Sequence, residues 1–303
     1  MDGHNSIMDF TVIIPTYNRA ESLQRLLASI ALLQGLRSLR LEVLVVNNGS
    51  TDGTAGIIQG EQEKALQYHL QVIEEAHRGK ASALNQGLRN ASGKVLMVLD
   101  DDVVAHPHLL VKHAECYKQT AFDAVQGKIL PGRDPEGHPA DMSRLSEYNI
   151  PLIDYGDEFR EIRGLTGTNM SFKREIYEKV GLFDPRLGPG AAGFSEDTEY
   201  SRRIRAAGFK IGYSPEAVVY HELNPKRYGR SYNREVEYRK GVSRSLYRRD
   251  SILFRVLPNL AANCFRYGLY LILGKSQKVY KTEGRIMKSW GYLAGKIQNR
   301  TAE

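Results

Sequence analysis

The sequence predicts an α/β fold in which a mostly parallel, Rossmann-like sheet is covered by helices on both faces. The first observation behind this prediction is the alternation of short apolar runs with segments of helical spacing. The second is that each apolar run ends in a polar turn, as strands do at the ligand-binding edge of a parallel sheet. The third is the aspartate triplet Asp100, Asp101 and Asp102, which closes the apolar run Val95–Leu99.

Four strands and at least two helices are predicted in the N-terminal part. The apolar runs that predict strands lie at 10–15, 41–46, 70–73 and 95–99. Leu23, Leu26, Leu27 and Ile30 recur at helical spacing after the first strand, and a further helix is expected to begin near Ala81. The turns between these elements are rich in Asn, Gly, Ser, Thr and Asp, which favour turns.

Later elements follow a less regular order. The predicted elements are a helix at 109–117, a strand at 124–129, an irregular connection at 131–164, a helix at 174–180, and strands at 211–213 and 217–220. The irregular connection is long enough to form a mobile lid. Ser195 is the expected N-cap of another helix, which has an acidic first turn and ends at Gly208. The last two strands would deliver His221.

Charge is distributed unevenly along the chain. The net charge is +7, but residues 224–303 contain 18 Lys and Arg against 5 Asp and Glu. The rest of the chain carries 24 basic and 30 acidic residues, so its balance is −6. Opposite charges on two parts predict an acidic catalytic body and a basic appendage that faces something anionic.

Cysteine content and the N-terminus both favour a cytoplasmic location. Cys116 and Cys264 are too few for a disulfide framework or a metal cluster, which suits a reducing compartment. Residues 1–9 contain no apolar stretch of the kind that a signal peptide needs.

Three adjacent carboxylates at a strand end point to a cation site. Carboxylates that lie close together repel one another unless a cation, a proton or solvent lies between them. A divalent ion held by one or two carboxylates and by substrate phosphates would remove this repulsion. A solvated acidic turn is the alternative interpretation of the triplet. No Walker motif occurs, which argues against P-loop chemistry.

Six segments, in this order along the chain, resemble motifs of the family 2 glycosyltransferases. They are VIIPTYNR at 12–19, VVNNGSTDGT at 45–54, HRGKASALNQG at 77–87, LDDD at 99–102, GTNMSFKREIYEKVGLFDPRL at 167–187 and EDTEYSRRIRAAG at 196–208. The resemblance covers about residues 10–221. It implies the GT-A fold of nucleotide-diphospho-sugar transferases and a reaction that inverts the configuration at the anomeric carbon.

The resemblance also assigns residues to the substrates. The positions implied for binding the nucleotide sugar are Pro15, Tyr17, Arg19, Asn48, Arg78, Lys80 and Asp100. The positions implied for the transferred sugar or the acceptor are Gly167, Thr168, Asn169, Glu196 and Arg203. Asn48 stands where an aspartate that contacts the base is common, and an amide can both donate to and accept from a base edge.

Catalysis is implied for Asp197, and metal binding for Asp102 and His221. A carboxylate at a helix start can take the proton from an acceptor hydroxyl, although acids there can also simply complement the helix dipole. Mn²⁺ or Mg²⁺ would be the cofactor, and an imidazole ligand suits Mn²⁺ better. His221 could equally be a packing residue. Asp101 is the middle acid of the motif and is expected to be replaceable.

The implied reaction moves a single sugar from a nucleotide-diphosphate sugar to a hydroxyl of a polysaccharide, glycolipid or lipid-linked precursor. The sequence lacks the QxxRW motif of processive synthases, which favours single addition. One alternative is a sugar-nucleotide-binding protein without transfer activity. Another is a nucleotidyltransferase, which would be expected to carry a glycine-rich basic loop where this chain has PTYNR.

The basic C-terminal part, 225–303, is predicted to be a mainly helical extension of a catalytic domain at 1–224. Its apolar stretch 252–273 is interrupted by Arg, Pro and Asn, which disfavours a membrane-spanning helix. An amphipathic helix on an anionic membrane surface fits this pattern better, on the cytoplasmic face. Helices that pack on the catalytic body with a solvated basic face are the alternative. No nucleic-acid-binding motif accompanies the basic residues, so we expect no nucleic-acid partner.

Overall fold

The computed structural model describes residues 8–36, 39–64, 67–134, 137–141 and 151–301. Its chain divides into two compact units. The first unit contains most of the chain up to Leu223, and the second contains 186–195 and the residues from Asn224 onwards, together with residue 141. The predicted boundary after residue 224 therefore differs by one residue. Segment 186–195, which the sequence placed in the catalytic domain, belongs to the second unit.

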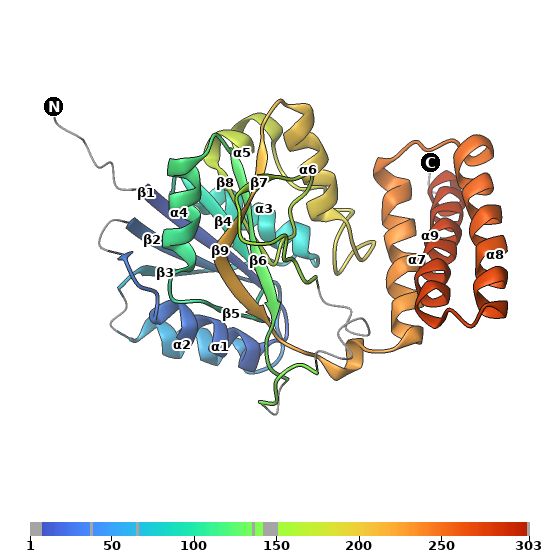
Figure 1. The fold of residues 1–303 in the computed structure, drawn as a ribbon. Coiled ribbons are helices and arrows are strands. Elements are labelled where there is room, and N and C mark those ends of the chain that lie inside the picture. The colour runs from blue at the N-terminus through green and yellow to red at the C-terminus, as the bar shows by residue number, and fades with distance from the viewer. Residues whose placement is uncertain (1–7, 37–38, 65–66, 135–136, 142–150, 302–303) are drawn as a thin grey trace. The chain divides into compact units, whose positions relative to one another are not determined.

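A single mixed sheet forms the centre of the first unit (Figure 1). Its strands within the described residues are β1 (Met8–Thr16), β2 (Leu39–Asn47), β3 (His69–Glu74), β4 (Val95–Leu99), β5 (Val103–Ala105), β6 (Ala124–Pro131), β7 (Arg160–Glu161), β8 (Asn169–Lys173) and β9 (Ile211–His221). The strand order is β3-β2-β1-β4-β8-β6-β9-β5, and β7 pairs with β9.

The predicted parallel arrangement is found in the N-terminal strands. β3, β2, β1 and β4 all run parallel, as do β6 and β9. β8 differs because it runs antiparallel between β4 and β6, and β5 and β7 run antiparallel to β9. The two short strands predicted around 211–220 form one strand, β9, whose pairing with β6 shifts register after Gly127. Residues 135–136 and 142–150 of the predicted irregular connection lie outside the described residues.

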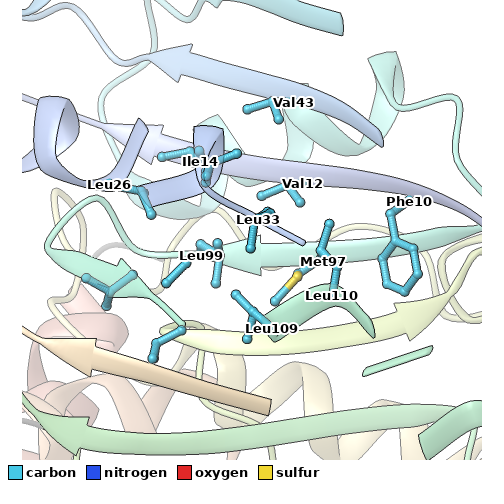
Figure 2. Packing of buried hydrophobic residues seen from close by; sticks show 14 of the residues in the cluster. Phe10, Val12, Ile14, Leu26, Leu33, Val43, Met97, Leu99, Leu109 and Leu110 are labelled. Carbon is cyan, nitrogen blue, oxygen red and sulfur yellow. The ribbon is translucent and has the colours of Figure 1, made fainter. Parts of the chain in front are cut away.

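Helices cover both faces of the sheet, as predicted. The helices of the first unit are α1 (Ala20–Ala31), α2 (Thr54–Gln62), α3 (Lys80–Asn90), α4 (Leu109–Gln119), α5 (Arg174–Val180) and α6 (Glu196–Ala206). Side chains alternate along each strand, so Val12 and Ile14 enter one apolar cluster and Ile13 the other. The first cluster packs under α1, α2 and α4 (Figure 2), and the second under α3, α5 and α6.

A buried polar network joins α4 to β8. The side-chain amide of Asn169 donates to two backbone carbonyls, so its Oδ1 atom is left to accept a hydrogen bond. His113 Nε2, 3.0 Å away, must therefore carry the hydrogen and donate it. His113 Nδ1 then accepts from the Ser171 hydroxyl at 2.9 Å. Burial lowers the pKa of His113 to about 4, which keeps the ring neutral in this network.

The second unit is helical, which confirms the predicted C-terminal extension. After a 3-10 turn at Pro225–Arg227, it contains α7 (Arg230–Tyr247), a π-helical turn at Ile252–Val256, α8 (Leu257–Ile272) and α9 (Ser276–Thr301). α9 packs along α7 and α8. The carboxylate of Glu283 is 7% exposed and binds Arg230 at 2.6 Å and Arg234 at 2.7 Å. Among the described residues no helix is both long and apolar enough to cross a membrane.

Close packing between α7 and α9 depends on glycines. A Cβ atom at Gly241 would collide with the backbone carbonyl of Lys288, and one at Gly291 with that of Tyr238. Gly268 in α8 has open space around its Cα atom instead.

Gly241→Ala should therefore destabilise the protein by about 1–3 kcal/mol, because backbone atoms cannot move aside as a flexible side chain can. Gly268→Ala is the matched control and should raise stability by up to about 1 kcal/mol through its helix propensity. Thermal unfolding followed by circular dichroism measures both. Equal effects of the two substitutions would contradict the proposed close packing of α7 on α9.

Protonation of His113 should make the first unit less stable in acid. Between pH 6.5, the ordinary pKa, and about 4, the unfolded chain binds a proton at His113 while the folded chain does not. Stability should therefore fall as the pH falls through this window, by ~3 kcal/mol from this group. Urea unfolding at both ends of the window should show a smaller loss for His113→Gln, which does not titrate. A loss as large as in the unsubstituted protein would refute this assignment.

Candidate active site

The polar turns predicted to share one sheet edge do meet there. Parallel pairing places Thr16 opposite Asn47 and Asn47 opposite Glu74, so β1, β2 and β3 end at the same level. β4 runs parallel beside β1 and ends at Leu99, directly before the aspartate triplet. In open α/β sheets this carboxyl edge is where ligands bind.

Tyr17 and Arg78 form an exposed pair at this edge. The guanidinium carbon of Arg78 lies 4.7 Å from the centre of the Tyr17 ring, and an Nη atom of Arg78 donates to the Tyr17 hydroxyl. Tyr17 is 39% exposed. An aromatic face beside a cation can receive a nucleotide base and its phosphates. Pro15, predicted for the same pocket, is a buried residue of β1.

Asn48 has a different role from the one predicted. Its side-chain amide donates to the carbonyls of Glu75 and His77 at 2.9 and 2.8 Å, and its Oδ1 atom accepts from the amide of Gly79 at 2.8 Å. Both amide hydrogens are thus used within the protein, so neither is offered to a nucleotide base. Asn48 instead fixes the conformation of segment 75–79, which leads into Lys80.

Lys80 lies between two of the predicted acids. Its Nζ atom donates to Asp100 Oδ1 and is 3.6 Å from Glu196 Oε1. The other Asp100 oxygen accepts from the Thr168 hydroxyl at 2.9 Å. Burial alone would lower the pKa of Lys80, but the charges of Asp100 and Glu196 outweigh burial and raise it. Lys80 is therefore a partly buried side chain, 17% exposed, that favours its charged form.

Gly167 provides the space for this lysine. A Cβ atom at Gly167 would lie 3.1 Å from Lys80 Nζ, closer than ordinary contacts allow. The amide of Gly167 points toward Asp197 Oδ2 at 3.4 Å. The structure thus brings together Lys80, Asp100, Gly167, Thr168 and the two acids at the start of α6.

Glu196 and Asp197 are carboxylates with raised proton affinity. Burial is the main cause that raises the pKa of each, and the charge of Lys80 opposes it. Asp197 Oδ1 accepts from the amide of Thr198 at 2.6 Å. A carboxylate with a raised pKa is a better proton acceptor at neutral pH than an ordinary one, which suits a general base. Ser195, the predicted N-cap, has φ +79°, outside the extended region typical of N-caps.

Asn169 and Arg203 do not face this site, which corrects their predicted contact with sugar or acceptor. Asn169 is fully buried, and its side chain is occupied by the His113 network. Arg203 pairs with Glu199 at 2.9 Å and donates to the carbonyls of Val180 and Leu182. It thereby holds α6 against the end of α5.

Asp102 and His221, the two residues predicted to bind a metal, lie close together. His221 Nδ1 lies 2.8 Å from the carbonyl oxygen of Glu222, which can only accept, so Nδ1 carries a hydrogen. In the neutral ring this leaves a lone pair on Nε2, 3.5 Å from Asp102 Oδ1. Two acceptors that face each other fit a cation between them. The described residues contain no group of three or more metal-ligating side chains, so the remaining ligands would have to come from substrate phosphates or water.

Arg19 lies beside Asp102. Its Nη1 atom is 3.4 Å from Asp102 Oδ2. It therefore brings a positive charge to the aspartate triplet, at the edge where the nucleotide sugar was predicted to bind.

Asp101 is more constrained than the sequence suggested. It is 9% exposed, and its Oδ2 atom accepts from the Thr16 hydroxyl at 2.8 Å. Burial and the charge of Asp102 raise its pKa. The expectation that this acid is replaceable overlooked its part in joining β1 to the turn after β4.

The hydrogen bonds of Glu222, the residue that follows His221, were not predicted from the sequence. Glu222 accepts from Arg25 Nε at 2.6 Å and from the Ser22 hydroxyl at 2.8 Å. Its amide donates to the carbonyl of Asp102 at 2.9 Å. Ser22 and Arg25 are one helical turn apart on α1, but no local signal names a partner so distant in sequence.

Known proteins match both the sequence and the fold. The model of the family described as "Glycosyl transferase family 2" matches residues 11–181. Glycosyltransferase AglE of Haloferax volcanii is 30% identical over 71% of this chain and 67% of its own length. A dolichol-phosphate mannosyltransferase of Pyrococcus furiosus is 29% identical over 58% of this chain, which spans only 49% of that protein.

Among solved structures, the mannosyltransferase PcManGT from Pyrobaculum calidifontis, in complex with GDP-Man and Mn²⁺, is similar with a TM-score of 0.64. It is 20% identical, and the match covers 96% of this chain and 87% of that one. The predicted GT-A fold is thereby confirmed. Since the family match spans more than half of the sequence, the chain belongs to the glycosyltransferases of family 2.

Proposed function

We propose that this protein transfers a single sugar from a nucleotide-diphosphate sugar to a hydroxyl of a carbohydrate or lipid-linked acceptor, with inversion at the anomeric carbon. The observation that carries this proposal is the placement of Lys80 between Asp100 and Glu196. Glu196 is the sequence neighbour of Asp197, the candidate base. The positive charge of Lys80 therefore lies in the same site as the Asp197 carboxylate, which could accept a proton, at the carboxyl edge of the sheet.

The donor would bind across the ends of β1, β3 and β4. Tyr17 offers an aromatic face for the base, and Arg78 a cation for the diphosphate. Lys80 and Arg19 lie deeper, each close to one acid of the aspartate triplet. PcManGT, which shares the fold, is known in complex with GDP-Man, and this supports a nucleotide sugar as the donor.

Asp197 would act as the general base. The acceptor hydroxyl oxygen attacks the anomeric carbon, its proton passes to Asp197, and the bond from carbon to the diphosphate oxygen breaks. The bonding electrons leave with the diphosphate, whose growing negative charge Lys80 and Arg78 stabilise. One displacement of this kind inverts the configuration at carbon.

Asp102 and His221 would hold a divalent ion, Mn²⁺ or Mg²⁺. Such an ion supplies positive charge to the leaving diphosphate when bound. Support comes from the two facing acceptor atoms and from PcManGT, which is known with Mn²⁺.

The proposed location of the protein is peripheral, at the cytoplasmic face of a membrane, where a lipid-linked acceptor would be found. The P. furiosus relative is named for transfer to dolichol phosphate, which favours a lipid-linked acceptor. The basic C-terminal residues suit an anionic surface of this kind.

Asp197→Asn should abolish transfer while leaving donor binding intact. The amide keeps the shape of the side chain but cannot take the proton, so turnover should fall by about 10²–10⁴-fold. Transfer is measured with a panel of nucleotide sugars and Mn²⁺, donor binding by calorimetry, and the anomeric configuration of the product by NMR.

Glu199→Gln is the matched control, because it removes one carboxylate from the same helix but one that binds Arg203. Its turnover per folded molecule should stay close to normal. Near-normal turnover in Asp197→Asn would overturn the assignment of the base. Binding of a sugar nucleotide without any transfer by the unsubstituted protein would instead indicate a binding protein.

A further inference from the structure

Helix α8 turns its polar side inward and its apolar side outward. Asn263 is 6% exposed, and its Oδ1 atom has no hydrogen-bond partner in the structure. Tyr267 and Tyr270 are partly buried on the same side. By contrast, Phe265 is 75% exposed and Ile272 is 85% exposed. A helix that packs on a protein core normally shows the opposite arrangement.

We call the outward side chains of α8 and of the π-helical turn before it the α8 apolar face. It consists of Leu253, Phe254, Leu257, Phe265, Leu269 and Ile272, all classed as exposed. Those within α8 are separated by eight, four and three residues, which places them within about a third of the helix circumference. Single exposed apolar residues are ordinary, but a clustered surface of this kind indicates a partner.

Positive charge predominates in the part of the chain that contains this face. Residues 251–300 contain nine Lys and Arg and a single acid, Glu283. Because Glu283 is buried and paired with Arg230 and Arg234, it contributes little negative charge to the surface. Arg266, Lys275 and Lys278 are exposed in the same part of the chain. The partner should therefore be apolar and anionic at once.

We propose that the α8 apolar face inserts into the interface of an anionic lipid bilayer, with the neighbouring lysines and arginines on the lipid headgroups. α8 has 16 residues and is about 24 Å long, too short to span a bilayer. A helix with this division of apolar and basic residues lies in the plane of the interface. Lipid surfaces combine acyl chains with clustered negative charge, which matches both properties of the face.

This proposal deepens the proposed membrane location by naming the surface that makes the contact. It does not depend on the chemistry of the active site in the first unit. A test that reads lipid binding rather than sugar transfer can therefore fail while the proposed enzyme activity stands, and the reverse also holds.

The test is co-sedimentation of the full chain with vesicles of phosphatidylcholine containing about a third phosphatidylglycerol, at low and high salt. The triple variant Phe254→Ser, Phe265→Ser, Ile272→Ser should lose at least about a hundredfold in partition coefficient, because three apolar side chains no longer leave water. The three positions are exposed, so the fold should persist, and circular dichroism checks this.

Leu32→Ser is the matched control, since Leu32 is 70% exposed in the first unit, away from this face in sequence. It should bind vesicles as the unsubstituted protein does. Binding should also weaken with salt and with vesicles of phosphatidylcholine alone. Failure of the unsubstituted protein to bind anionic vesicles, or unchanged binding by the triple variant, would overturn the proposal. So would light scattering that shows a dimer which the triple variant abolishes while vesicle binding is unaffected.

Discussion

The ion pairs of one partly buried lysine, Lys80, with two carboxylates are the interaction on which the rest of this site depends. Lys80 would be costly to bury as a lone cation, and Asp100 and Glu196 would be costly to bury as lone anions. The opposite charges of Lys80 and the two carboxylates offset this cost, so the three side chains must stay close together. The surrounding chain follows from this need. Asn48 fixes the segment before Lys80, Gly167 leaves room for it, and the Thr168 hydroxyl satisfies the second oxygen of Asp100.

The sequence predicted the parallel part of the fold well because its signals are local. Short apolar runs and the polar turns that follow them can be recognised without knowledge of distant partners. The antiparallel strand β8 escaped prediction because pairing direction depends on the rest of the sheet. Site residues show the same limit. Asn169 and Arg203 lie within the recognised segments, yet a motif does not tell which way a side chain points. Thr16 was missed because its partner, Asp101, is 85 residues away.

The segment that precedes the acidic helix α6 along the chain belongs to the helical unit. Segment 186–195 belongs to the helical unit and runs directly into Glu196 of the first unit. Within the helical unit, the Ser243 hydroxyl of α7 donates to the carbonyl of Ala192 and accepts from the amide of Phe194. Ser195 then adopts a left-handed conformation that is unfavourable for a residue other than glycine. These hydrogen bonds hold residues 192–194 against α7 within the helical unit.

The central claim is that the charge of Lys80 both balances the acids and receives the diphosphate of the donor. Calorimetric titration of Lys80→Met with nucleoside diphosphates tests it most directly, since methionine keeps the length of the side chain and removes the charge. Lys64→Met, at an exposed lysine of the first unit, is the control. The account predicts at least about a tenfold loss of affinity in Lys80→Met and none in the control. A folded Lys80→Met protein that binds nucleoside diphosphates as tightly as the unsubstituted protein would contradict it.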